Sequence, residues 1–232
     1  MAGVGGAVEG VSTGTTILAA TYDGGVVLGA DSRTSTGNYV ANKTADKITK
    51  VCDRVYLCRS GSAAHTQAVS AYANLYLNQH AIELGHKGVR VRTAANIVKE
   101  IAYSNKGWMM AGMIVAGWDV NEGGKVFAIT LGGTMMDAPF ATGGSGSVYI
   151  NAYCDKNFKP NMTKEECKAF VRKAVSLAIS RDGSSGGVIR TITVDKDEQV
   201  KEFVPGDVVP VYQDEVPVHE SRTIQFLSSA SV

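Results

Sequence analysis

The sequence has little of the features that mark several specialised classes of protein. Its 232 residues include four cysteines, five prolines and two tryptophans. The cysteines form no C-x-x-C pair and lie at no zinc-ligand spacing, which indicates free thiols and no metal site. A formal net charge of +1 provides no basic surface for nucleic acid or for an anionic membrane. The most apolar stretch, residues 108–118, is too short to span a bilayer.

Charged residues are also scarce, whereas glycine is abundant. Charged residues make up 19% of the chain, below the roughly 25% that is usual for soluble domains. This indicates that partner subunits cover part of the surface. The 26 glycines are about 11% of the 232 residues, above the base rate of about 7%. The backbone is therefore expected to make many tight turns. A length of 232 residues fits one large domain with a full core.

Runs of strands and helices predict the fold class. Strands are expected over residues 16–20, 26–30, 55–60, 113–118, 126–131, 188–194 and 199–204. Helices are expected over residues 63–84 and 94–106. A third helix is expected to begin within residues 143–153, and a fourth to follow the capping box at 163–166. Several strands are apolar on both faces and need cover on both sides. We therefore expect an α+β fold, a four-layer α-β-β-α sandwich of two face-to-face antiparallel sheets with helix pairs outside.

Two turns rich in glycine and serine are candidates for chemistry. The turn at 183–187 fits the G-x-S-x-G pattern of a serine-hydrolase elbow with Ser185 as nucleophile. That motif needs a strand before it and a helix after it, and here the expected order is reversed. The turn at 143–147 lacks the lysine of a phosphate-binding loop. Glycine-rich turns that line a site with their hydroxyls are the better interpretation of both, and a serine hydrolase using Ser185 stays as an alternative.

A set of motifs in the first quarter of the chain gives a sharper signal. They read G-T-T at 14–16, G-A-D-S-R at 29–33, A-D-K-I at 45–48 and R-S-G-S at 59–62. In this order and spacing, and together with the turns at 143–147 and 182–187, they resemble the proteasome beta subunits. This family belongs to the N-terminal-nucleophile hydrolases. The resemblance extends from Thr15 to about Asp207.

The resemblance implies a nucleophile that is released by self-cleavage. Residues 1–14 would be a propeptide removed between Gly14 and Thr15, residues 15–212 the hydrolase domain and 213–232 a C-terminal extension. A threonine hydroxyl is a weak nucleophile and needs a base beside it. The free α-amine of Thr15 provides that base, because an unperturbed α-amine has a pKa of about 7.7–8.0.

The other catalytic residues are likewise carried over from the family pattern. Lys47 would lie beside the Thr15 hydroxyl and favour loss of its proton, and Asp31 would hold Lys47 by a charge-assisted hydrogen bond. The amide N–H of Gly61 would be the oxyanion donor. The residues expected to surround the Thr15 amine and order its water are Ser145, Asp182 and Ser185.

The expected substrate pocket resembles that of the beta-1, or caspase-like, type. Arg59 would lie at its base, where a guanidinium suits an acidic side chain of the substrate. The other expected members of the pocket are Thr34, Ala45, Thr49, Ala63 and Gln67. Ala45 departs from the type, which usually has a threonine there. The resemblance therefore implies a threonine endopeptidase that cleaves after acidic residues.

The resemblance also implies partners and a compartment. The chain would work in a stack of four seven-membered rings, two of alpha and two of beta subunits, on unfolded polypeptides in the cytoplasm and nucleus. It would need no cofactor and no metal, and would bind neither nucleic acid nor membrane. One alternative is a non-catalytic structural beta subunit. The presence of Thr15, Asp31 and Lys47 argues against it, since a silent subunit need not keep them.

Overall fold

The computed structural model describes residues 14–37, 39–85, 88–210 and 212. One sheet contains β1 (Ile17–Tyr22), β2 (Gly25–Ala30), β10 (Phe140–Gly143), β11 (Ile189–Asp195) and β12 (Gln199–Val204). The other contains β5 (Ile48–Cys52), β6 (Val55–Gly61), β7 (Ala111–Asp119), β8 (Gly123–Ile129) and β9 (Met135–Asp137). A separate hairpin consists of β3 (Thr34–Thr36) and β4 (Tyr39–Asn42). The helices are α1 (Ala63–Leu84), α2 (Val91–Ser104), α3 (Ser147–Asn157) and α4 (Lys164–Arg181).

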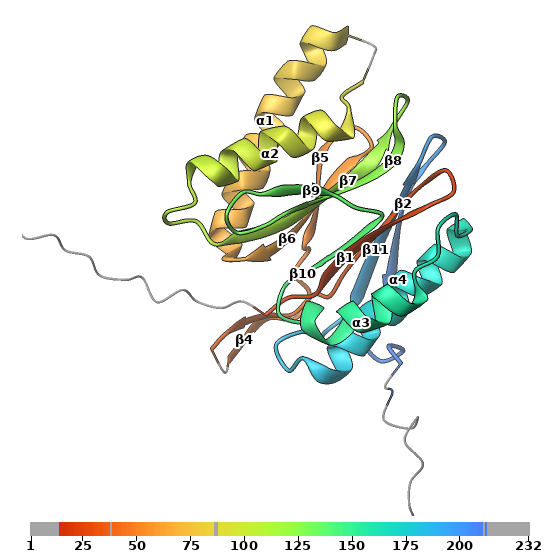
Figure 1. The fold of residues 1–232 in the computed structure, drawn as a ribbon. Helices are drawn as coiled ribbons and strands as arrows, with labels where there is room; N and C mark the ends of the chain where they lie inside the picture. The colour runs from red at the N-terminus through yellow and green to blue at the C-terminus, as the bar shows by residue number, and fades with distance from the viewer. Residues whose placement is uncertain (1–13, 38, 86–87, 211, 213–232) are drawn as a thin grey trace, which may run out of the picture.

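These elements form the four-layer sandwich that the sequence predicts. The strand orders are β10-β1-β2-β11-β12 in one sheet and β5-β6-β7-β8-β9 in the other, and all neighbouring strands are antiparallel. Helices α1 and α2 cover the outer face of the β5–β9 sheet, and α3 and α4 cover the other sheet (Figure 1). The fold prediction is therefore confirmed. The expected propeptide, apart from Gly14, and the expected extension over 213–232 lie outside the described residues.

Three apolar layers hold the sandwich together. Ile17, Leu28 and Ile114 pack between the two sheets. Val27 points the other way and packs under α3 and α4, and Val115 packs under α1 and α2. Successive side chains of a strand point to opposite faces, so a strand covered on both sides must be apolar at nearly every position. This requirement explains the continuous apolar runs in the sequence.

Several element boundaries differ from the sequence prediction, and strands β3, β4, β5, β9 and β10 were not expected. Two of the differences have a clear physical reason. The helix expected within 143–153 begins only at Ser147, because residues 140–143 pair with β1 as strand β10. Helix α2 begins at Val91 and not after Thr93. Its first N–H is capped by the carboxylate of Asp119, which comes from the turn between β7 and β8. The capping box between Thr163 and Glu166 is confirmed. The four thiols are free, as predicted, and the structure also shows them buried.

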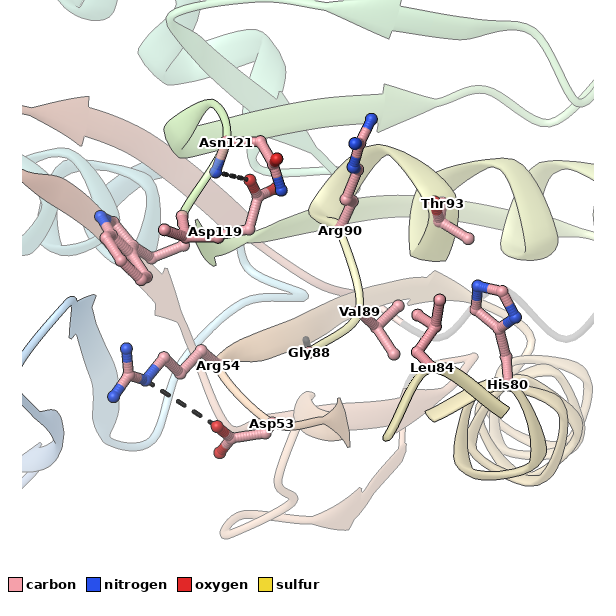
Figure 2. Close-up of a pocket in the computed structure, with 12 residues that line it drawn as sticks. Asp53, Arg54, His80, Leu84, Gly88, Val89, Arg90, Thr93, Asp119 and Asn121 are labelled. Carbon is pink, nitrogen blue, oxygen red and sulfur yellow. Dashed lines mark hydrogen bonds and ion pairs between the residues drawn. The ribbon is translucent and has the colours of Figure 1, made fainter. Parts of the chain in front are cut away.

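The Asp119 cap gives a stability prediction. Its buried carboxylate accepts the N–H groups of Val91, Asn121 and Glu122 at 2.9, 2.8 and 2.9 Å. Figure 2 shows the Asn121 contact. Asp119→Ala should lower the free energy of unfolding by about 2–3 kcal/mol, because buried donors lose a charged acceptor. Urea unfolding of the purified chain measures this, with Val120→Ala at the exposed neighbouring position as the control. A variant as stable as the parent would contradict the role of the cap.

The pKa of Asp119 adds a pH dependence to this prediction. Burial would raise the pKa of this carboxyl, but the backbone hydrogen bonds outweigh it and hold the pKa below the ordinary value. The stabilisation is therefore complete above the unfolded-state pKa of about 3.9. It is lost as the pH falls through the lower folded-state value. Asp119→Ala should thus have its full effect near neutral pH and a smaller effect in strong acid.

Candidate functional site

The centre of the site is the peptide bond between Gly14 and Thr15, just before β1. The Thr15 hydroxyl is buried and donates to the Gly14 carbonyl oxygen at 2.6 Å. The Lys47 ammonium donates to the same oxygen at 3.0 Å. Gly14 has no room for a side chain, because a Cβ there would lie 2.1 Å from the Cβ of Ser184. A hydroxyl nucleophile, a carbonyl and a positive charge thus converge at one bond.

Lys47 is held by an ion pair with the fully buried Asp31 at the end of β2. The Lys47 Nζ lies 2.7 Å from Oδ1 of Asp31. The Asp31 carboxylate also accepts the backbone N–H groups of Thr16, Arg33 and Gly186 at 2.8, 3.1 and 2.9 Å. Burial lowers the pKa of Lys47, and the charge of Asp31 opposes that shift. The structure therefore places Asp31 and Lys47 in the contact that the resemblance implies.

The two serine-rich turns meet on the other side of Thr15. The Thr15 N–H donates to Oγ of Ser145 at 3.1 Å. Ser145 and Ser185 donate to the same oxygen of Asp182 at 2.8 and 2.6 Å. Burial would raise the pKa of Asp182, but hydrogen bonds from Ser184, Ser185 and Ser145 outweigh it and lower the pKa. Asp182 is therefore an anion that orients hydroxyl groups next to the Thr15 nitrogen.

The environment of Ser185 argues against a serine-hydrolase nucleophile. Its turn follows helix α4 and precedes strand β11, the reverse of a nucleophile elbow. Its hydroxyl donates to Asp182 and lies 2.7 Å from Oγ1 of Thr16. A serine nucleophile needs a base that accepts its proton, and a carboxylate of lowered pKa is a poor one. Ser185 therefore belongs to the hydroxyl cluster around Thr15.

A cavity of about 200 Å³ opens beside Thr15 and has Arg59 in its wall. The guanidinium of Arg59 donates to the carbonyl oxygen of Asp46, and its buried Nε has no hydrogen-bond partner among the described residues. Burial lowers the pKa of Arg59, while Asp46 opposes the shift. An anion entering this cavity would relieve a positive charge that burial disfavours. Predicted members that also line the cavity are Thr34, Ala45, Ala63 and Gln67.

One predicted pocket residue, Thr49, is not among the residues that line the cavity, and several lining residues were missed. Thr49 pairs with Leu57 of β6, and Leu57 packs in the layer under α1 and α2. The lining residues that the sequence analysis did not select are Asn42, Asp46 and Thr66. Asp46 adjoins Lys47, and Thr66 lies one helical turn after Ala63, so spacing alone could have indicated both. Ser184 was also missed and joins Ser145 and Asp182 at 2.9 and 2.6 Å.

Gly61, the predicted oxyanion donor, lies where β6 ends beside the cavity. Its φ of +102° is one that other residues rarely adopt. A Cβ there would also lie 2.4 Å from the carbonyl oxygen of Met110. Gly61 lines the Thr15 cavity and also a second, larger cavity. The backbone at this position therefore needs glycine, and it runs directly past the nucleophile.

A third cavity, of about 790 Å³, lies at the opposite end of the β5–β9 sheet (Figure 2). Three of its charged groups, Asp53, Arg54 and Asp119, are engaged with one another or with the backbone. Arg54 pairs with Asp53 at 3.8 Å, and Asp119 accepts backbone N–H groups. In the described ranges we find no cluster of metal-binding side chains and no helix long and apolar enough to span a bilayer. The cavity at Thr15 is therefore the candidate active site.

Comparisons with known proteins agree with this fold. Residues 11–194 match the family model described as "Proteasome subunit". The chain is 52% identical over 210 residues to "Proteasome subunit beta type-6" of Arabidopsis thaliana, covering 90% of each chain. It is 49% identical over 184 residues to "Proteasome subunit beta type-1" of Saccharomyces cerevisiae, covering 79% of this chain and 85% of that one. The chain therefore belongs to the proteasome beta-subunit family.

Proposed function

We propose that the chain is a catalytic beta subunit, a threonine endopeptidase that cleaves itself before Thr15 and then cleaves polypeptides after acidic residues. The observation that carries the proposal is the convergence of the Thr15 hydroxyl and the Lys47 ammonium on the Gly14 carbonyl. A structural subunit has no need for a buried lysine aimed at that bond. Burying a charge is costly unless it is paired and hydrogen-bonded, so such a lysine indicates chemistry.

Self-cleavage follows from the geometry at Gly14. The Thr15 Oγ1 attacks the Gly14 carbonyl carbon and passes its proton to water, while Lys47 stabilises the negative charge on the carbonyl oxygen. The bond to the Thr15 nitrogen then breaks, and that nitrogen takes up a proton. The Gly14 acyl group now forms an ester with Oγ1. Water hydrolyses this ester, which releases residues 1–14 with a free carboxyl group and leaves Thr15 with a free amine.

Substrate hydrolysis then uses the freed amine as the base. The amine lies where the Thr15 N–H now meets Ser145, so the hydroxyl cluster orients it. It takes the proton from Oγ1 as Oγ1 attacks the scissile carbonyl, and the N–H of Gly61 stabilises the oxyanion. The amine returns the proton to the leaving nitrogen. Water hydrolyses the remaining acyl ester, with the same amine as base, and restores Thr15.

Specificity for acidic residues rests on Arg59. Its guanidinium lies in the wall of the cavity that also contains Thr15. The lowered pKa of Arg59 means that burial disfavours its charge. A substrate carboxylate would restore a partner to this charge and add a charge-assisted hydrogen bond. Ala45 contributes only a methyl group to the same cavity, so Arg59 is the group proposed to select the side chain.

Arg59→Met tests this specificity, since it keeps most of the stem and removes the charge. Removing one partner of such a pair costs about 2–5 kcal/mol. Cleavage after Glu or Asp should therefore fall roughly 30- to several-thousand-fold, at about 1.4 kcal/mol per tenfold. Self-cleavage should survive, because Gly14 places no side chain in the cavity. The measurement is kcat/KM on peptides that differ only before the scissile bond, in complexes whose other active sites are blocked.

The control for this assay is Arg54→Met at the opposite end of the sheet, which should leave the preference unchanged. An unchanged ratio of acidic to apolar cleavage in Arg59→Met would refute the assignment. The ratio would then depend on Ala45 or on a neighbouring subunit.

Intact-mass measurement of the purified chain separates the catalytic subunit from the structural one. Loss of residues 1–14 supports the catalytic subunit, and an unprocessed chain supports the structural one.

The setting of this activity follows from the family. Membership of the proteasome beta-subunit family implies assembly with other proteasome subunits. We further propose a stack of four seven-membered rings, two alpha and two beta, that receives unfolded polypeptides in the cytoplasm and nucleus. The proposed reaction uses only groups of the chain itself and water. Size-exclusion chromatography with subunit identification by mass spectrometry checks the assembly.

A further inference from the structure

A second cavity, of about 770 Å³, begins at the catalytic centre and has no part in the reaction described above. It extends from Gly61 at the end of β6 to Ser145 in the turn after β10. Gly61 is shared with the Arg59 cavity, and Ser145 accepts the Thr15 N–H at 3.1 Å. Thr15 therefore lies between two cavities that meet at Gly61.

The position of the amine shows which half of a substrate this second cavity would receive. In the proposed reaction the Thr15 amine returns its proton to the leaving nitrogen, so that nitrogen must lie on the amine's side of Oγ1. Ser145 marks this side. The acyl half lies on the other side, because the Gly14 carbonyl is bound by Lys47, which lines the Arg59 cavity. The chain that follows the scissile bond is thus directed toward Ser145 and the second cavity.

In the part of the chain that the structure describes, the lining of the second cavity contains no acidic or strongly basic side chain and is mainly apolar. No Asp, Glu, Lys or Arg is among the described residues that line it, whereas the Arg59 cavity has three such residues. Its more exposed wall consists of Trp108, Met110, Leu131 and Met136, which are 62%, 52%, 53% and 48% exposed. Methionine side chains are flexible and adapt to different apolar ligands. Large apolar side chains left in contact with solvent beside a nucleophile favour an apolar ligand.

Local contacts hold part of this wall in place. The His65 ring meets the Trp108 ring edge-on, with centroids 5.2 Å apart and an interplanar angle of 89°. Nδ1 of His65 accepts the backbone N–H of Met110 at 3.3 Å. Ser60 donates to the Gly112 carbonyl oxygen at 2.7 Å, so its hydroxyl is already engaged. This part of the wall is therefore preorganised, and its polar groups already have hydrogen-bond partners within the chain.

We propose that this second cavity binds the polypeptide segment that follows the scissile bond and selects a large apolar side chain there. The inference rests on the proposed function, since it concerns the leaving half of the same cleavage. The subunit would then read two positions: an acidic residue before the bond through Arg59, and an apolar residue after it through the second cavity. Its preferred substrates would be segments in which an acidic residue precedes a leucine or an aromatic residue.

The test uses assembled complexes whose other active sites are blocked. One set of internally quenched peptides has Asp before the scissile bond and Leu, Phe, Gly, Asp or Lys after it. A reference peptide has Asp joined to a small fluorescent amine. Full burial of a Leu or Phe side chain should raise kcat/KM roughly 10- to 100-fold over Gly or Asp. A flat profile with normal cleavage of the reference peptide overturns this inference alone. Failure to cleave the reference peptide overturns the proposed function as well.

Two charge variants make the assignment specific to this cavity. Leu131→Asp should shift the preference after the bond from Leu toward Lys, and Met136→Lys should shift it toward Asp. The ratio should move in each case by about 3- to 10-fold. Val120→Asp, on the exposed turn at the far end of the sheet, is the matched control and should leave the ratio unchanged. Opposite shifts support the proposal. Unchanged ratios, or variants that alter only subunit assembly, overturn it and indicate a subunit contact instead.

Discussion

Replacing Thr15 with alanine should leave an assembled but inactive subunit that keeps its leader. The variant removes the only atom proposed to attack both the Gly14 carbonyl and the substrate, so activity should fall by about 10⁴- to 10⁶-fold. The fold should persist, because the contact of the hydroxyl with Gly14 joins two neighbouring residues and ties no distant elements together. Intact mass reports the leader, and cleavage of a peptide with Asp before the bond reports activity.

Thr16→Ala is the matched control, since it removes a neighbouring buried hydroxyl that contacts Ser185 and not the Gly14 carbonyl. It should still be processed. Normal processing of Thr15→Ala, in a complex with no other active subunit, would show that another group cleaves the leader. Loss of assembly in Thr15→Ala would show that the hydroxyl is structural.

Removing the Lys47 ammonium should abolish turnover without unfolding the protein. Lys47→Ala removes the charge that stabilises the Gly14 carbonyl oxygen in self-cleavage and favours proton loss from the Thr15 hydroxyl in turnover, so kcat should fall by about 10³-fold or more. The Asp31 carboxylate keeps its hydrogen bonds from the backbone N–H groups of Thr16, Arg33 and Gly186. The buried carboxylate is therefore still hydrogen-bonded when the lysine is removed. Processing and peptide hydrolysis should both fail, while the chain should still assemble. Near-normal hydrolysis in Lys47→Ala would refute its role.

Asp31→Asn is the complementary change and should also destabilise the chain. It leaves Lys47 as a buried cation without its counter-charge, which costs about 3–5 kcal/mol. Lys50→Ala on the exposed edge of β5 is the control, because its ion pair with Asp53 is exposed to solvent. It should change neither activity nor stability measurably. A stable, active Asp31→Asn variant would mean that the ion pair does not hold Lys47 in place.

Local sequence predicts the sandwich well because its rules act over short distances. The capping box at Thr163 forms as expected, since Thr163 and Glu166 are one helical turn apart. Strand β7 is apolar on both faces, and it does lie between two apolar layers. Boundaries set by distant partners were missed. Helix α2 begins at Val91 because the carboxylate of Asp119, which is 28 positions away, accepts the Val91 N–H. Residues 140–143 form β10 because they pair with β1.

From the sequence alone follow the grouping of strands and helices, the need to cover both faces of each sheet, and a family resemblance that points to Thr15, Asp31 and Lys47. The short strands β3, β4, β5, β9 and β10 were not predicted. Only the tertiary structure decided which side chains meet. Ser145 reaches the Thr15 nitrogen across 130 positions because β10 lies beside β1 in the sheet. Ile48, next to Lys47, packs instead between the two sheets, since its side chain follows the register of β5 against β6. Contacts across sheets depend on strand register, and register is set by packing of the whole core, which no local stretch of sequence encodes.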